Sequence, residues 1–249
     1  MEELTMLLDA VRPHLEELRR RLFRCAAAFV LALVAGMFAA GPILAFLREN
    51  GPAAHLALHA FSPWEGIQVY MQVATVAAMV FVGPYCGIQL WLFAAPGLRT
   101  EERRAALRYI PLSTLLLAAG ILFGYFVVFR MAFLFTAGVS DSIQVKTLYS
   151  IQAYFSFMVN IVVPMGLLFL MPAIVMFLTR LGLLTPQRLS RMRRYAYMTL
   201  IVLGVCITPP DFISDFLLIV PLLSLYEVSI LCCGLTYRKI RLRQPLTPD

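Results

Sequence analysis

The sequence is poor in charge and lacks the residue patterns that most enzymes need. Only 14% of its 249 residues are charged, whereas 61% are hydrophobic. A soluble domain has an apolar share of about 45–50%, because water must solvate its surface. The sequence contains no phosphate-binding glycine loop and no nucleophile elbow. These absences exclude an ordinary soluble domain, and we expect that the protein is not an enzyme.

Patterns for metal, cofactor or nucleic-acid binding are also weak. His55 and His59 have the i, i+4 spacing that a metal could use, but no third ligand accompanies them. The five cysteines include no CxxC pair and lie mostly in apolar runs, where we expect them to pack as small apolar side chains. The net charge of +7 comes from loops that would meet anionic lipid headgroups. We therefore expect no metal, no cofactor and no nucleic-acid partner.

The sequence is instead rich in long apolar runs, and its mean hydropathy is +0.81. Runs of about 20 residues cross a hydrocarbon core of about 30 Å as helices, and these runs lack the alternation of a barrel strand. The fifth run is short, because residues 208–211 read Thr-Pro-Pro-Asp and must end a helix. It should form a short helical hairpin with the sixth run. We predict an all-α integral membrane protein, a single domain over 1–249, with six transmembrane helices at about 22–47, 69–93, 109–136, 154–178, 195–207 and 214–237.

The basic residues predict the orientation of these spans. Of the 21 arginines and lysines, 18 fall on one side of the six-span arrangement, which predicts that both termini are cytoplasmic. A four-span arrangement would require a re-entrant final hairpin. Residues 2–20 have apolar side chains at helical spacing, and we expect an amphipathic helix along the cytoplasmic membrane surface. The run after Arg20 and Arg21 is too long for an ordinary cleaved signal, so we expect it to be retained.

Acidic residues near the predicted cytoplasmic face occur in two pairs beside arginines. Glu16 and Glu17 precede the first span, and Glu101 and Glu102 follow the second. They could form local ion pairs, each worth about 0–1 kcal/mol. They could also form a carboxylate pocket for a cationic ligand, where a hydrogen bond to a charged group contributes roughly 1.5–3 kcal/mol. The spacing of these residues leaves both interpretations open.

Three other acids lie deeper in the predicted spans or at their external ends. Glu65 is at the external end of the second span, Asp211 is at the turn of the final hairpin, and Glu227 is inside the sixth span. A carboxylate near the middle of the membrane costs roughly 2.5–3.5 kcal/mol, so Glu227 is a candidate functional residue. The alternative is a hydrogen-bonded glutamate that holds helices together.

Two glycine pairs bear on how the spans pack. Gly83/Gly87 and Gly120/Gly124 have small-xxx-small spacing, which should let helices of this chain approach closely. No internal repeat is visible between the first three and last three spans. A secondary transporter of a small solute would need mid-membrane ionisable groups and paired broken helices. The chain offers one such acid and one proline-rich break, so this function is our second choice.

Short motifs along the chain occur in the order found in a known family. Residues 14–21 read HLEELRRR, residues 62–65 SPWE, and residues 89–98 QLWLFAAPGL with ERR at 102–104. Residues 124–126 read GYF, residues 208–211 TPPD, and residues 225–227 LYE after Pro221. Together these motifs resemble the TatC family, the multi-spanning component of the twin-arginine translocase, over nearly the whole chain.

The resemblance implies a receptor and core subunit that exports folded proteins across the plasma (inner) membrane of a prokaryote. Mapped by motif, Glu17 and Glu102 would bind the two arginines of a signal peptide, and Arg19 and Phe93 would shape the site. Guanidinium groups match carboxylates in a bidentate geometry that lysine does not reproduce. The resemblance further implies single-span partners of the TatA and TatB type, other copies of the chain, membrane lipids and transport driven by the proton-motive force.

The sequence departs from the family pattern at three positions. Leu170, just before Pro172 in the fourth span, replaces the usual glutamate or glutamine. Gln72 stands where family members often have a lysine, and Asp215 follows Ser214 where glutamine is usual. The resemblance implies the following candidates for contact with partner helices: Leu170, Pro172, Pro209 and Pro210.

Overall fold

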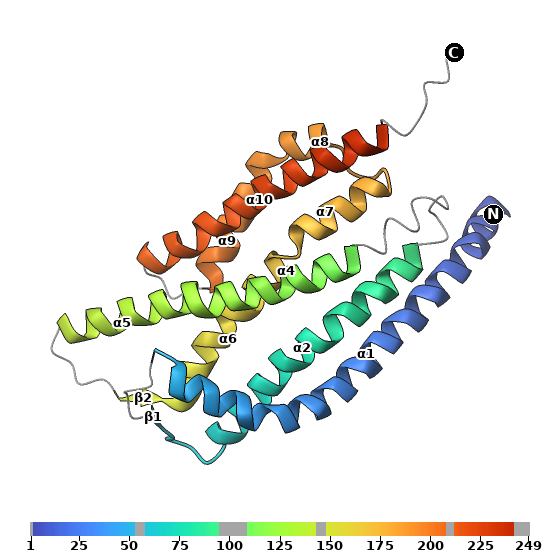
Figure 1. Cartoon of the computed structure of the whole chain (residues 1–249). Coiled ribbons are helices and arrows are strands. Elements are labelled where there is room, and N and C mark those ends of the chain that lie inside the picture. Colours follow the sequence, from blue (N-terminus) through green and yellow to red (C-terminus); the bar gives the residue numbers. More distant parts are fainter. Residues whose placement is uncertain (1, 53–57, 95–108, 143–147, 208–211, 242–249) are drawn as a thin grey trace.

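The chain folds as a bundle of long helical segments, and α1 and α2 run antiparallel (Figure 1). The computed structural model describes residues 2–52, 58–94, 109–142, 148–207 and 212–241. Two short strands, β1 (Leu58–His59) and β2 (Tyr149–Ser150), pair in parallel. The helices are α1 (Glu2–Asn50), α2 (Glu65–Ala94), α4 (Tyr109–Phe123), the π-helix η2 (Gly124–Phe129), α5 (Arg130–Ser142), α6 (Ile151–Leu168), α7 (Met171–Arg180), α8 (Pro186–Arg191), α9 (Arg193–Ile207) and α10 (Phe212–Arg241).

Five helical segments within the described residues are long and apolar enough to cross a membrane. This confirms an all-α protein with several membrane-spanning helices. The predicted fifth span is helix α9, which has 15 residues and is therefore about 22 Å long, shorter than the hydrocarbon core. The five segments cover residues 16–50, 65–89, 110–142, 151–180 and 215–239.

The helix ends fall into two groups at opposite ends of the bundle. The beginning of α1, the end of α2, the beginning of α4 and the ends of α7 and α10 lie at one end, and the two strands lie at the other (Figure 1). Helix α1 is continuous over 49 residues, so the predicted amphipathic segment 2–20 joins the first span without a break. The position of this segment on the membrane surface stays a prediction.

The third and fourth spans are each irregular near the middle. In the third, the six residues of η2 form a π-helix, which leads directly into α5. In the fourth, α6 ends at Leu168 and α7 begins at Met171. Pro172 explains this break, because its ring lacks a donor and clashes with the preceding helical turn. Leu170 lies at the break and is half-buried, whereas Pro172 is buried.

Small residues allow the helices to pack closely. A Cβ atom on Gly36 of α1 would lie 2.6 Å from the carbonyl oxygen of Ala74 on α2. A Cβ on Gly120 would lie 2.9 Å from the Cα of Gly166 on α6, and one on Gly124 would lie 3.1 Å from the Cα of Val162. The prediction that the Gly120/Gly124 pair packs within this chain is therefore confirmed, but the Gly36 contact was not predicted from the sequence.

Candidate functional site

The register of α1 against α2 can be followed from two close contacts. Gly36 faces the backbone of Ala74, and Gly41 faces the Tyr70 hydroxyl group, which a Cβ there would approach to 3.2 Å. Because the two helices are antiparallel, each step back along α1 corresponds to one step forward along α2.

The same register continues toward the end of the bundle at which α1 begins. The Cys25 and Cys86 thiols face each other, eleven residues before Gly36 and twelve after Ala74. Glu17 lies nineteen residues before Gly36, and Phe93 lies nineteen residues after Ala74. Since both helices rise by about 1.5 Å per residue, Glu17 and Phe93 lie at the same level at the end of the α1–α2 pair.

The Glu17 carboxylate is held by an arginine of its own helix. The Arg21 Nε donates to Glu17 Oε1 at 3.1 Å, and Arg21 Nη2 donates to the same oxygen. The side chain of Glu17 remains 35% exposed. The pair is partly buried, with the Arg21 side chain 16% exposed, and an i, i+4 ion pair on a helix contributes about 0.3–0.5 kcal/mol.

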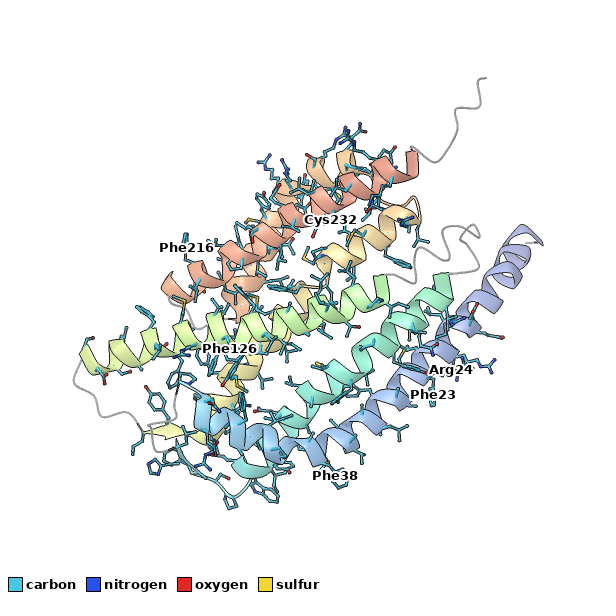
Figure 2. The ribbon with its side chains drawn as sticks, in the orientation of Figure 1. Phe23, Arg24, Phe38, Phe126, Phe216 and Cys232 are labelled. Carbon is cyan, nitrogen blue, oxygen red and sulfur yellow. The ribbon has the colours of Figure 1, made fainter. Side chains whose placement is uncertain are left out.

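A shallow hollow of about 430 Å³ follows one face of α1 next to this pair. Phe23, which is 76% exposed, and Arg24 are labelled on this part of α1 in Figure 2. The face therefore combines an apolar ring with charged groups of both signs. The hollow is lined by Glu16, Arg19, Arg20, Phe23, Arg24 and Ala27.

Three of the four predicted signal-binding residues can be located in the structure. Glu17 and Phe93 are half-buried and lie at one level. Arg19 is exposed and lines the hollow. Glu102 lies outside the described residues, and so do Pro209, Pro210 and Asp211.

At the opposite end of the bundle, Glu65 links two helix beginnings. It lies in the first turn of α2, is only 6% exposed, and accepts a hydrogen bond from Ser150 Oγ at 2.9 Å. The same Ser150 oxygen accepts from the Ala153 N–H and caps α6. A carboxylate near the N-terminus of a helix is favoured by the helix dipole. Glu65 therefore connects α2 to α6 beside the β1–β2 pair.

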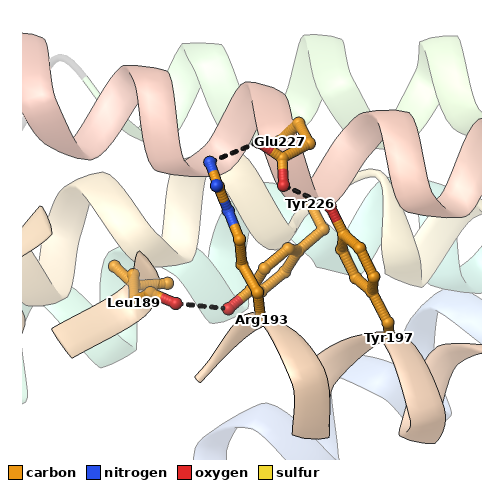
Figure 3. Close-up of polar contacts among 5 residues, drawn as sticks. All are labelled: Leu189, Arg193, Tyr197, Tyr226 and Glu227. Atoms are coloured by element: carbon orange, nitrogen blue, oxygen red, sulfur yellow. Dashed lines mark hydrogen bonds and ion pairs between the residues drawn. The ribbon is translucent and has the colours of Figure 1, made fainter. Parts of the chain in front are cut away.

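Glu227 joins α10 to the beginning of α9 (Figure 3). It accepts a hydrogen bond from Arg193 Nη2 at 2.7 Å and another from the Tyr197 hydroxyl. The neighbouring Tyr226 hydroxyl donates to the Leu189 carbonyl at 3.0 Å, which holds α8 against α10. The arrangement matches the hydrogen-bonded alternative for Glu227, in which the glutamate holds helices together.

Two of the unusual residues also have defined surroundings. Gln72 Nε2 donates to Ser156 Oγ at 2.8 Å and links α2 to α6, while Gln72 Oε1 is buried without a hydrogen-bond partner among the described residues. Asp215 lies in the first turn of α10 and is half-buried.

Sequence reasoning missed the partners of the deep acids. Ser150 could have been found as an N-cap, because serine before an apolar helical run is a common helix start. Arg193 and Tyr197 are four residues apart, a spacing that puts both on one helix face. That they meet Glu227 could not be foreseen, because their contact depends on the packing of α9 against α10.

Comparison with known proteins gives consistent matches. The family model for the Sec-independent protein translocase protein (TatC) matches residues 13–221. The Sec-independent protein translocase protein TatCy of Bacillus subtilis (strain 168) is 44% identical over 226 residues, which cover 91% of this chain and 89% of that protein. TatC of Halalkalibacterium halodurans is 42% identical over 236 residues, which cover 95% and 93%.

A solved structure agrees with these sequence matches. A crystal structure of the twin-arginine translocase receptor TatC has a TM-score of 0.78 at 30% identity, covering 90% of this chain and 99% of that chain. The relatives are translocase proteins and give no support to the solute-transporter alternative. The matches in sequence and fold extend over most of the chain, which belongs to the TatC family of Sec-independent protein translocase proteins.

Proposed function

We propose that this chain is the receptor and core subunit of a twin-arginine translocase in the plasma (inner) membrane of a prokaryote. It would cross the membrane six times, with α9 as a short fifth pass and both termini in the cytoplasm. Two observations support this topology. Arginine and lysine residues are concentrated in the predicted cytoplasmic segments, and the beginning of α1 lies at the same end of the bundle as the end of α10 (Figure 1).

The observation that carries the receptor function is the common level of Glu17 and Phe93 beside the hollow on α1. We infer that the first arginine of a signal peptide takes the place of Arg21 on the Glu17 carboxylate. The exchange gives up an i, i+4 ion pair of α1, worth about 0.3–0.5 kcal/mol. It gains a hydrogen bond to a charged group, worth roughly 1.5–3 kcal/mol when water is excluded. Glu102 is proposed to bind the second arginine.

Arg19 and Phe93 would shape this site from opposite helices. Arg19 is exposed in the hollow and can form hydrogen bonds with peptide carbonyl groups. Phe93 offers an aromatic face for guanidinium stacking. The apolar part of the signal peptide would then follow the exposed apolar side chains of α1, beginning at Phe23.

Transport itself would require further subunits. We propose single-span partners of the TatA and TatB type, association with other copies of this chain, and energy from the proton-motive force. Leu170 and Pro172 at the α6–α7 break and Pro209 and Pro210 before α10 remain candidates for partner contacts. An apolar Leu170 predicts packing, rather than a carboxylate hydrogen bond, at that position.

Binding of synthetic signal peptides to the purified protein tests the receptor function. An Arg-Arg peptide should bind at least several-fold more tightly than its Lys-Lys counterpart, because only guanidinium groups pair in a bidentate manner with carboxylates. Glu17→Lys or Glu102→Lys should weaken binding of the Arg-Arg peptide by several-fold or more while the protein still inserts. Fluorescence anisotropy of a labelled peptide gives both affinities.

Glu49→Lys is the matched control, because Glu49 is an exposed acid at the other end of α1. It should leave the affinity unchanged. Equal binding of the two peptides would refute the receptor function. Unchanged binding in both Glu17→Lys and Glu102→Lys would assign these acids to local ion pairs.

A further inference from the structure

A second charged surface lies away from the Glu17 site, at the end of the bundle formed by α8 and α10. Helix α8 packs beside the C-terminal half of α10 (Figure 1). Nitrogen-tipped side chains surround α8 and the end of α10 in Figure 2. We call this the α8–α10 basic surface; its members are all exposed and are Arg188, Arg191, Arg194, Arg238 and Lys239.

The charge of this surface is poorly balanced by acids. Residues 180–241 include eight arginines and lysines but only three acids. Of these acids, Asp211 precedes α10 in the sequence, and Asp215 lies in the first turn of α10, at the other end of that helix. The third, Glu227, is already bound to Arg193 and Tyr197. Within the described part of the chain, no member of the basic surface forms an ion pair with a carboxylate.

Helix α8, which carries part of this surface, is fixed by a helix cap and by packing against α10. Thr185 caps α8 by accepting from the Arg188 N–H. Leu189 is 7% exposed and packs in an apolar cluster with Tyr226 and Cys233. Its carbonyl oxygen accepts a hydrogen bond from the Tyr226 hydroxyl group. These contacts turn the inner face of α8 toward α10, so that Arg188 and Arg191 remain exposed on the helix.

The apolar neighbours of the arginines indicate what kind of anion fits. Leu183 is 58% exposed, Met192 is 55% exposed and Tyr195 is 72% exposed, and all three lie within a few residues of the exposed arginines. A soluble anion would make no favourable contact with exposed apolar side chains. A surface at the boundary of a bilayer needs both apolar and cationic side chains, because apolar groups enter the acyl region while cations contact the phosphates.

We propose that the α8–α10 basic surface is a binding site for the phosphodiester headgroups of anionic phospholipids. Helix α8 lies at the membrane boundary, with Leu183, Met192 and Tyr195 among the lipid chains and the arginines on the phosphates. This site is separate from the signal-peptide site and would anchor the α8–α10 end of the protein in the leaflet that it faces.

Native mass spectrometry of the delipidated full chain tests this proposal without any signal peptide. The protein in detergent is titrated with phosphatidylglycerol or phosphatidylcholine, and bound lipids are counted. Wild-type protein should retain phosphatidylglycerol several-fold better. Because each basic residue near an anionic surface contributes roughly a fivefold factor, R188Q/R191Q/R194Q should lower this retention by tenfold or more.

Two further variants separate a specific site from net charge and from misfolding. R188K/R191K/R194K keeps the charge and should retain most of the lipid binding. R48Q/R130Q removes two exposed arginines elsewhere and should leave retention unchanged. The proposal is overturned if wild-type protein shows no preference for phosphatidylglycerol, or if R48Q/R130Q loses as much binding as R188Q/R191Q/R194Q.

The source of the phosphate is tested in the same experiment. Inorganic phosphate at millimolar concentration should not displace phosphatidylglycerol, because it lacks the acyl chains that contact Leu183, Met192 and Tyr195. Displacement at that concentration would identify a site for soluble anions instead. Tighter binding of an acidic peptide than of phosphatidylglycerol would assign the surface to a protein partner. Either result would overturn the lipid proposal.

Discussion

Replacing Gly36 with alanine perturbs a close contact between α1 and α2. The new methyl group would lie 2.6 Å from the Ala74 carbonyl oxygen, whereas ordinary contacts of this kind begin at 3.4 Å. The obstructing atom belongs to the backbone of α2 and cannot rotate away. The two helices must therefore separate by several tenths of an ångström or bend locally.

The expected cost follows from two opposing effects. Overpacking of a well-packed contact costs about 1–3 kcal/mol, and the better helix propensity of alanine offsets about 0.5–1 kcal/mol of this. The free energy of unfolding should therefore fall by up to about 2.5 kcal/mol, and by about 1–3 kcal/mol relative to a helical glycine-to-alanine change that meets no obstruction. For a protein of this length, 1 kcal/mol shifts Tm by about 2–4 °C, so Tm should lie about 2–12 °C below that of the unobstructed change.

Thermal unfolding in detergent micelles, followed by circular dichroism, measures this change. Gly234→Ala is the matched control, because Gly234 is also helical and a Cβ there meets no atom within 4 Å. Its Tm should stay the same or rise. If Gly36→Ala is no less stable than Gly234→Ala, the close α1–α2 contact, and with it the register that aligns Glu17 with Phe93, is wrong.

Two more predictions concern the polar links between helices. Ser150→Ala should lower the free energy of unfolding by about 1–3 kcal/mol, because it removes a helix cap and a hydrogen bond to the Glu65 carboxylate. Thermal unfolding measures this loss. An unchanged Tm would contradict the role of Ser150 in linking α2 to α6. Glu227→Gln, Arg193→Gln and their combination form a double-mutant cycle. The coupling energy should be about 0.2–1 kcal/mol, because the side chains are 37% and 45% exposed. A coupling below this range would mean that the ion pair does not hold α9 to α10.

The apolar runs were sufficient to predict the long helices, but they did not predict α8 (Pro186–Arg191) or the irregularities of the long helices. The run 109–136 becomes α4, η2 and α5 and extends to Ser142. The run 154–178 contains the α6–α7 break, which Pro172 could have indicated. An uninterrupted apolar run indicates burial in lipid but carries no period, so it does not distinguish an α-helix from a π-helix.

The candidate site was predictable only in part. Glu17 and Phe93 were selected through motifs, and their common level follows from the Gly36–Ala74 contact, which lies nineteen residues away from each of them. The prediction that Glu227 is deep in the sixth span used only its position along that span and not its neighbours on other helices. Its ion pair with Arg193 depends on the short length of α9 and on how that helix is placed against α10. Such contacts arise from packing between distant segments and have no local pattern.

Photocrosslinking from the signal peptide tests the central claim most directly. A benzoylphenylalanine placed beside the Arg-Arg pair of a synthetic peptide is irradiated with the purified protein, and labelled residues are identified by mass spectrometry. We predict labelling on α1 between residues 16 and 24 and on α2 near Phe93, and little labelling with a Lys-Lys peptide. Labelling that is confined to other helices, or that is equal for both peptides, would contradict the proposal that this end of α1 and α2 receives twin-arginine signals.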